Sequence, residues 1–215
     1  MKIKTIAVTN LPTHPGVINL KRSLIKHSIP NEIIVVPWQG FFTKVDEAYK
    51  YCKETDAEWI LFVDAHDVIF VGGLDDVEER IKGFRDCDCI FSSEKACWPD
   101  SNLADMYPEC NSQWKYLNSG TYLFKPQKLV EAVDKCPPKI GIDDQLYFHK
   151  HLLNENMDCV LDTNCEIFQT LAHDDGSSFG MVDGKFTNLV TKSNPVVIHG
   201  NGLAFDEFDY SYITE

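Results

Sequence analysis

The feature that most constrains the fold is an apolar run, Trp59–Val63, that ends directly in Asp64. Such a run is typical of a buried strand, so the acid emerges at the carboxyl end of that strand. A second carboxylate, Asp67, follows three residues later. Open α/β sheets bind ligands at this edge, and two carboxylates offer hard oxygen ligands to a divalent cation. The run therefore predicts a metal site that also holds phosphate oxygens, as in enzymes that act on nucleotides.

Strand-like and helix-like patterns alternate along the chain, and this alternation defines the expected architecture. Strands are expected at Ile3–Thr9, Glu32–Pro37, Trp59–Asp64, Cys89–Ser92, Tyr116–Phe124, Cys159–Leu161, Ile167–Thr170 and Pro195–His199. Helices are expected over residues 17–27, 45–52, 74–82, 126–135 and 145–153, the first with Val17, Leu20, Leu24 and Ile25 on one face. Repeated βα units predict an α/β fold with a mostly parallel central sheet flanked by helices. No linker or repeat is apparent, so residues 1–215 are expected to form one domain.

The charge balance limits the partners of the chain. Its net charge is −13, and only three of its 20 basic residues are arginines. Nucleic-acid surfaces need clustered basic residues to displace counterions, so we expect no nucleic-acid partner. No apolar stretch approaches the roughly 20 residues of a membrane helix, so we expect no membrane association.

The N-terminus and the cysteines bear on the cellular compartment. The first residues lack the apolar core and cleavage site of a signal peptide. If Met1 is the native start, a cytoplasmic or otherwise soluble protein is expected. None of the eight cysteines forms a C-x-x-C pair, so buried, reduced thiols are expected rather than a zinc site. The clustering of four cysteines between residues 87 and 110 is also compatible with a disulfide bond in this segment.

A third candidate metal ligand follows another apolar strand. The segment Pro195–Ile198 ends in His199, and Gly200-Asn201-Gly202 comes next. Glycines allow close backbone approach to an anion such as a diphosphate. A nitrogen donor added to the two carboxylates would suit Mn²⁺ better than Mg²⁺. A purely structural role, as a cap or turn residue, is the alternative for each of these side chains.

Three further segments contain candidate ligand-binding residues. Carboxylates in Asp143-Asp144-Gln145 open a helical pattern, where they either cap the helix or face a reacting carbon. The amide, hydroxyl and glycine of Leu117-Asn118-Ser119-Gly120 suit hydrogen bonds to sugar hydroxyls and equally suit a turn. Trp38 and Trp98 could stack on sugar or base faces. Trp98 lies in the aperiodic segment 94–115, and loops of that length are usually functional or disordered.

One rival motif is rejected. His173-Asp174-Asp175, together with His199, matches the H-x-D…H pattern of non-haem iron oxygenases. Those enzymes also need a basic residue beyond the second histidine to hold 2-oxoglutarate, and no Lys or Arg follows His199. The βα organisation also differs from their all-β core.

Taken together, the candidate segments resemble the glycosyltransferase domain of the procollagen lysyl hydroxylases, the multifunctional collagen-modifying enzymes. Six segments occur in the family's order and extend over nearly the whole chain. They are Phe62–Ile69, residues 91–99 with Phe91–Glu94 and Cys97–Pro99, Leu117–Gly120, Asp143–Leu146, Ile167–Gln169 and Ile198–Gly202.

The resemblance implies a GT-A fold, a UDP-sugar donor and Mn²⁺ as cofactor. The metal ligands that it implies are Asp64, Asp67 and His199. The catalytic residues that it implies, beside the sugar and acceptor, are Asp143, Asp144 and Trp98. The residues that it implies in the donor pocket are Thr9, Trp38, Lys44, His66, Asn118, Ser119, Gly120, Gln145, Gly200, Asn201 and Gly202.

The sequence also departs from the family pattern. Residue 66 is His where the family has a Tyr that stacks on uracil, and the acidic run at residues 143–144 is shorter than the family's. The loop between Trp38 and Lys44 is shorter too. Only 13 residues follow Gly202, so no hydroxylase domain is expected in this chain.

These observations predict a Mn²⁺-dependent glycosyltransferase that transfers a hexose, with glucose as the first choice, from a UDP-sugar. The resemblance implies galactosyl-hydroxylysine of a collagen-like protein as the acceptor and retention of configuration. The alternatives are a hydroxylysine galactosyltransferase or glycan-directed transferase of the same fold, and a catalytically silent UDP-sugar-binding module. The sequence is compatible with a monomer and with a homodimer.

Overall fold

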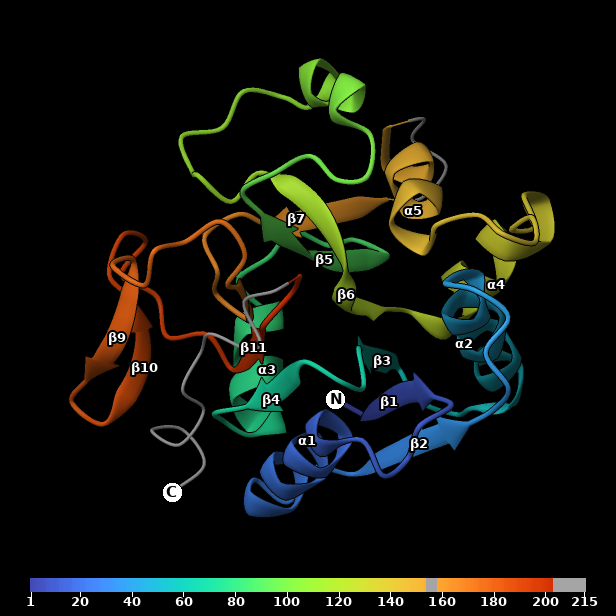
Figure 1. Cartoon of the computed structure of the whole chain (residues 1–215), viewed down its shortest axis with the longest axis horizontal. Coiled ribbons are helices and arrows are strands. Elements are labelled where there is room, and N and C mark those ends of the chain that lie inside the picture. The colour runs from blue at the N-terminus through green and yellow to red at the C-terminus, as the bar shows by residue number, and fades with distance from the viewer. Residues whose placement is uncertain (154–157, 203–215) are drawn as a thin grey trace.

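The computed structural model describes residues 1–153 and 158–202 and begins with repeated βα units (Figure 1). The first half contains β1 (Ile3–Thr9), α1 (Pro15–Lys26), β2 (Asn31–Val35), α2 (Phe42–Glu54), β3 (Trp59–Val63), β4 (Val68–Phe70), α3 (Leu74–Ile81) and β5 (Cys89–Glu94). The second half contains the 3₁₀ helix η1 (Ser101–Met106), β6 (Tyr116–Phe124), α4 (Pro126–Lys135), α5 (Asp144–Leu153), β7 (Cys159–Asp162), β8 (Phe168–Thr170), β9 (Phe179–Val182), β10 (Lys185–Asn188) and β11 (Val197–His199).

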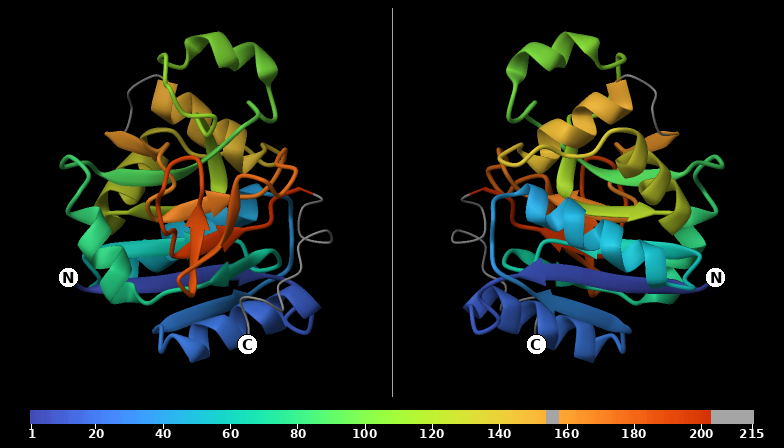
Figure 2. Two further views of the ribbon diagram at one scale, coloured as in Figure 1. Left: turned by 90° about the vertical axis from the view of Figure 1, so that its left-hand side faces the viewer. Right: turned by 90° about the vertical axis from the view of Figure 1, so that its right-hand side faces the viewer.

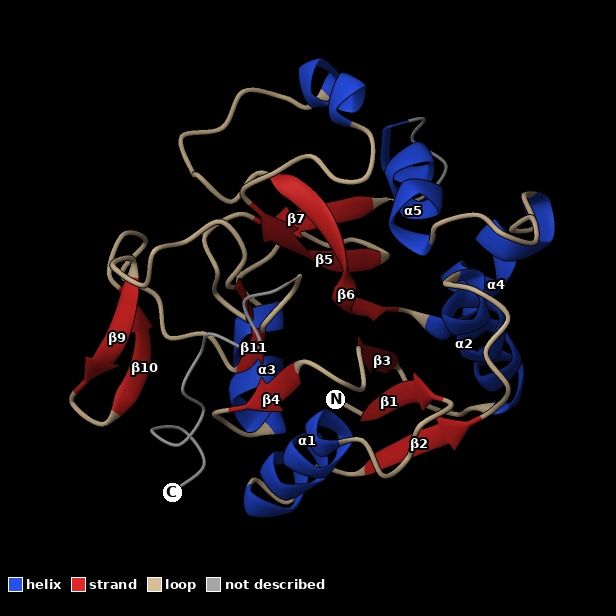
Figure 3. Cartoon of the chain, in the orientation of Figure 1, coloured by secondary structure: helices blue, strands red, loops and turns tan. Residues whose placement is uncertain are grey.

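A six-stranded sheet with the order β2-β1-β3-β6-β5-β7 forms the centre of the fold (Figure 3). Strand β1 pairs in parallel with β2 and β3, and β5 pairs in parallel with β7. Strand β6 runs antiparallel to both of its neighbours, β3 and β5. The sheet is therefore mixed but mostly parallel, and the predicted α/β architecture is confirmed.

Helices cover both faces of this sheet, so the apolar residues of a strand divide between two core clusters (Figure 2). In β1, Ala7 packs with α1 and α3, whereas Ile6 and Val8 pack with α2, α4 and α5. This division follows from the alternation of side chains along a strand. One prediction for α1 is wrong: Leu24 is buried, but Ile25 is 76% exposed. The next residue along a helix is rotated by about 100° and leaves the apolar face.

A second, three-stranded sheet with the order β4-β11-β8 lies beside the central one. Strand β11 pairs antiparallel with β4, which places His199 opposite Val68. The Gly200 N–H donates to the Asp67 carbonyl at 2.8 Å and continues this ladder. Since β4 begins directly after Asp67, the pairing carries His199 to the two carboxylates that follow β3.

An irregularity in β6 shapes the same region. In the pairing with β5, Phe91 lies opposite Tyr122, but the next residue, Ser92, lies opposite Asn118. The residues of β6 between these two positions form a bulge, which re-aims side chains at the edge of a ladder. Within the bulge, the Gly120 carbonyl accepts a hydrogen bond of 2.7 Å from the Asp64 N–H.

Like the short strand β4, the strands β9 and β10 and the helix η1 were not predicted from the sequence. Strands β9 and β10 form a hairpin whose two-residue turn, Asp183-Gly184, has positive φ angles of 50° and 73°, as a type I′ turn requires. The segment that contains η1 projects away from the central sheet, at the top of Figures 1 and 2. All eight cysteines are free thiols. Among the described residues, no helix combines the length and apolarity that a bilayer crossing requires.

Candidate active site

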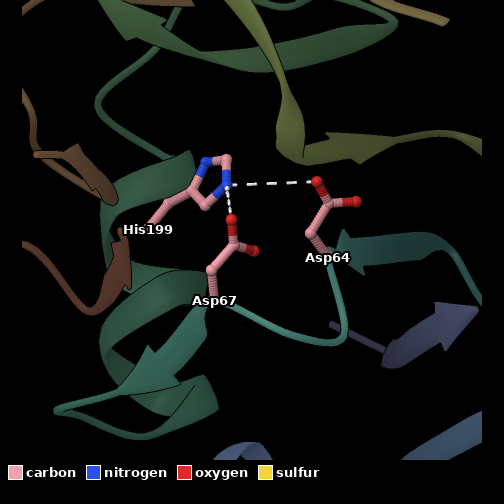
Figure 4. A group of neighbouring side chains, drawn as sticks. All are labelled: Asp64, Asp67 and His199. Carbon is pink, nitrogen blue, oxygen red and sulfur yellow. Dashed lines mark ion pairs between the residues drawn. The ribbon is translucent and has the colours of Figure 1, made fainter. Parts of the chain in front are cut away.

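Three side chains from two sheets form a candidate metal centre (Figure 4). Asp64 follows β3, Asp67 precedes β4, and His199 ends β11. The His199 Nε2 atom lies 3.3 Å from the Asp67 carboxylate and 3.9 Å from the Asp64 carboxylate. One ligand atom from each residue falls within 4.8 Å of the others. The structure therefore brings together the three ligands predicted from the sequence.

The orientation of the His199 ring is fixed by Asn118 and Gly120. The Asn118 Oδ1 atom accepts a hydrogen bond of 3.0 Å from the Gly120 N–H, which identifies it as the oxygen of the amide. His199 Nδ1 lies 3.0 Å from the same oxygen and must therefore carry a hydrogen. Because Nδ1 is committed to this hydrogen bond, Nε2 is the ring nitrogen that faces the carboxylates and is available to a metal, as in metal sites whose histidines donate their other N–H. The donor set thus fits a divalent cation.

The charges of the three residues are coupled. Burial raises the pKa of Asp64 to about 6. Burial alone would lower the pKa of His199, but the carboxylates of Asp67 and Asp64 raise it. Burial would likewise raise the pKa of Asp67, but the facing imidazole lowers it. Two acids and a histidine therefore compete for protons in a small volume, which is the electrostatic environment that a divalent cation stabilises.

A third carboxylate, that of Asp144, lies next to this centre and is joined to it by Lys44. Lys44 is buried, and its Nζ atom lies 2.9 Å from both Asp64 and Asp144. Burial alone would lower the pKa of Lys44, but Asp144 and Asp64 raise it, so the side chain is a cation. The Ser119 hydroxyl donates to Asp144 at 2.9 Å. By contrast, the Asp143 carboxylate accepts from the Leu146 N–H at 2.9 Å and so caps α5.

A buried hydrogen-bond network joins the remaining predicted residues. Gln145 accepts from the Ser119 N–H at 3.1 Å and donates to the Trp98 carbonyl at 2.7 Å. It also donates to Glu94, whose other carboxylate oxygen accepts from the Asn201 amide at 2.9 Å. The Asn201 oxygen accepts from two backbone N–H groups that follow β8. These contacts anchor the Trp98 backbone, while the residue as a whole stays 63% exposed.

Glu94 is a site residue for which no role was predicted from the sequence. It is buried, burial raises its pKa, and it joins α5 to the loop after β11. The available signal was its place two residues after a predicted strand, within one of the six family-like segments.

A hollow of about 190 Å³ opens beside the carboxylates. Its lining residues are Val8, Phe41, Asp64, Ala65, His66 and Asp67. Thr9, at the end of β1, lies 2.9 Å from the His66 ring nitrogen. Trp38 meets Phe41 edge-on, with a distance of 5.9 Å between the ring centroids. Phe41 is therefore a second aromatic residue on this side of the site, and it was not predicted from the sequence. Gly202 ends the described chain with a φ of +68°.

A mostly parallel mixed sheet whose strand ends hold an acid pair and a histidine agrees with the GT-A glycosyltransferase fold that the sequence led us to expect. The fold is similar to the glycosyltransferase involved in glycosylation of the PBCV-1 major capsid, with a TM-score of 0.52, 11% identity and coverage of 96% of both chains. It is also similar to apo mouse xyloside xylosyltransferase 1, with a TM-score of 0.51, 10% identity and coverage of 93% of this chain and 97% of that one. At these identities the similarity concerns the fold alone.

The chain belongs to the PLOD GT domain family, whose family model matches residues 43–213. It is 37% identical over 180 residues to the procollagen-lysine,2-oxoglutarate 5-dioxygenase of Drosophila melanogaster, covering 78% of this chain and 24% of the relative. The human multifunctional procollagen lysine hydroxylase and glycosyltransferase LH3 is 32% identical over 173 residues, covering 76% of this chain and 23% of the relative. The uncharacterized protein R699 of Acanthamoeba polyphaga mimivirus is 34% identical over 150 residues, covering 69% and 32%. The family resemblance and the GT-A fold are thus confirmed, while the chain spans a quarter to a third of these relatives.

Proposed function

We propose that residues 1–215 form a single-domain, Mn²⁺-dependent glycosyltransferase that transfers a hexose, glucose as first choice, from a UDP-sugar with retention. The observation that carries this proposal is the Asp64–Asp67–His199 cluster, with Asp144 held beside it through Lys44. The proposed acceptor is galactosyl-hydroxylysine of a collagen-like chain. This choice is supported by the name of the human relative, which joins a procollagen lysine hydroxylase to a glycosyltransferase.

Each part of the site has a distinct task in this proposal. Asp64, Asp67 and His199 would hold Mn²⁺, which when bound acts as a Lewis acid on the diphosphate leaving group. Lys44 places a second, buried positive charge where negative charge develops on the departing UDP. Asp144, which accepts a hydrogen bond from Ser119, would stabilise positive charge at the anomeric carbon. Asp143 acts indirectly, through the α5 cap.

The residues around this centre bind the donor and limit access of water. Thr9, His66, Phe41 and Trp38 form the side of the site that accepts the nucleotide base. Trp98 presents an exposed indole from a backbone held by Gln145, so it can cover the sugar. Exclusion of water would suppress hydrolysis of the donor in favour of transfer.

The proposal is tested by UDP release from a panel of UDP-sugars, with and without Mn²⁺ and with galactosyl-hydroxylysine peptides. We expect metal-dependent release from UDP-glucose that the glycopeptide accelerates. UDP binding without release from any donor would identify a silent binding module. Release that other acceptors accelerate, but the glycopeptide does not, would overturn the proposed acceptor. Absence of both Mn²⁺-dependent UDP binding and turnover would overturn the function.

Replacing Asn118 with Leu is expected to weaken Mn²⁺ binding about 10- to 100-fold, the usual cost of losing an outer-shell partner of a ligating histidine. The substitution removes the oxygen that accepts from His199 Nδ1, so the ring loses its fixed tautomer. Mn²⁺ affinity in the presence of UDP can be measured by electron paramagnetic resonance. The matched variant Asn118→Asp keeps an acceptor for His199 and for the Gly120 N–H, and it should retain most of the affinity. Equal affinities for the two variants would contradict this role.

A further inference from the structure

His66 is held on two sides by neighbouring residues. The His14 ring stacks on it with a centroid distance of 4.5 Å and an interplanar angle of 26°. The Thr9 hydroxyl lies 2.9 Å from its Nε2 atom. One face and one edge of the His66 imidazole are therefore occupied, and the ring still lines the 190 Å³ hollow beside the carboxylates.

The start of α1 builds this arrangement. His14 precedes the helix, and its Nδ1 atom accepts a hydrogen bond of 3.1 Å from the Gly16 N–H. A Cβ atom at Gly16 would lie only 1.7 Å from the His66 carbonyl oxygen. The helix start thus approaches the His66 backbone so closely that only glycine fits there. Thr9 is fixed in turn, because its hydroxyl accepts from the Leu11 N–H at 2.9 Å.

We propose that His14 is a positioning residue for the nucleobase of the donor. By stacking on His66, it keeps the His66 imidazole in a fixed orientation in which the base can stack on it. This inference rests on the proposed function, because it concerns the nucleotide of the same donor. An imidazole offers a smaller stacking area than a phenol ring. A small ring that is already immobilised loses less conformational freedom when the base binds. The His14 stack therefore compensates for the absence of a larger aromatic ring at position 66.

His14 has a ring and a capping nitrogen, and two variants separate their effects. His14→Asn keeps a good helix-capping acceptor but removes the ring. His14→Phe keeps a stacking ring but removes the acceptor for the Gly16 N–H. If the ring positions His66, His14→Asn weakens UDP binding by about 3- to 10-fold, the range expected when one side chain must be immobilised on binding. His14→Phe should then bind UDP within about twofold of the unmodified protein and should unfold at a lower temperature, because it has lost a cap.

The experiment measures binding of UDP and of inorganic pyrophosphate, each with Mn²⁺, by isothermal titration calorimetry, with thermal unfolding in parallel. The expected result is a loss for His14→Asn that affects UDP but not pyrophosphate, because pyrophosphate has no base. In a His66→Ala background, His14→Asn should cause no additional loss. Unchanged UDP affinity in His14→Asn, or an equal loss for pyrophosphate, would overturn the inference alone. An unmodified protein that binds no UDP would overturn the proposed function as well.

Discussion

Replacing Asp64 with Asn is expected to lower turnover of the UDP-sugar by at least about 1,000-fold, equal to about 4 kcal/mol of transition-state stabilisation. Asp64 provides one oxygen of the proposed metal centre and pairs with Lys44 at 2.9 Å. The Asn side chain keeps the shape and an acceptor for Lys44, but it loses the negative charge that attracts a divalent cation. UDP release at saturating Mn²⁺ and donor measures the effect.

The loss should occur without unfolding. Burial raises the pKa of Asp64 to about 6 in the folded protein, from an ordinary value of 3.8. The folded state therefore binds this proton more tightly, and the stability associated with it is lost as the pH rises from about 4 to 6. At neutral pH the folded protein therefore bears the cost of burying an ionised carboxylate. Asn is neutral and does not bear this cost, so circular dichroism and thermal unfolding should show an intact fold.

A matched control separates the site from the chemical change itself. Asp183→Asn makes the same substitution in the exposed β9–β10 turn, where Asn tolerates the positive φ angle of 50°. This variant should retain full turnover. Comparable activity of Asp64→Asn and Asp183→Asn would exclude Asp64 from the metal centre.

The sequence was sufficient to predict where the acids and the histidine would lie, because each follows an apolar run that ends at a sheet edge. Trp59–Val63 is fully buried in β3, so Asp64 had to emerge at its end. The apolar residues before His199 likewise form β11. The strand that joins the two parts, Val68–Phe70, has only three residues. No periodicity can be recognised over so short a segment, yet its antiparallel pairing with β11 sets His199 beside Asp67.

Contacts between segments far apart in the chain could not be predicted from local sequence patterns. Lys44 and Asp144 are 100 residues apart in the chain, and only the packing of α2 and α5 onto the same sheet face makes them an ion pair. The sequence alone does not distinguish the roles of the neighbouring acids Asp143 and Asp144. The geometry of the helix start makes Asp143 the cap of α5 and directs Asp144 to Lys44. The bulge in β6 depends on a register with β5 that neither strand specifies alone.

Replacing Gly120 with Ala is expected to weaken Mn²⁺ binding by at least about 100-fold, beyond the usual loss from an outer-shell substitution. A Cβ atom at this position would lie 2.0 Å from the His199 Cε1 atom, closer than any real contact permits. The backbone at Gly120 cannot shift easily, because two hydrogen bonds hold it. The Gly120 carbonyl accepts from the Asp64 N–H, and the Gly120 N–H donates to the Asn118 side chain. The imidazole must therefore rotate away from the carboxylates. Electron paramagnetic resonance of Mn²⁺ with UDP measures the loss.

The cause of this loss can be separated from general damage to the sheet by two comparisons. Gly180→Ala adds a methyl group in β9 where no atom lies within 4 Å, so metal binding should be unaffected. In a His199→Ala background the clash partner is gone, so Gly120→Ala should cause no further loss of Mn²⁺ affinity. Additive losses in that double variant would mean that the methyl group acts through the backbone and not through the His199 ring. Non-additivity would instead show that Gly120 is required because it leaves room for a correctly oriented metal ligand.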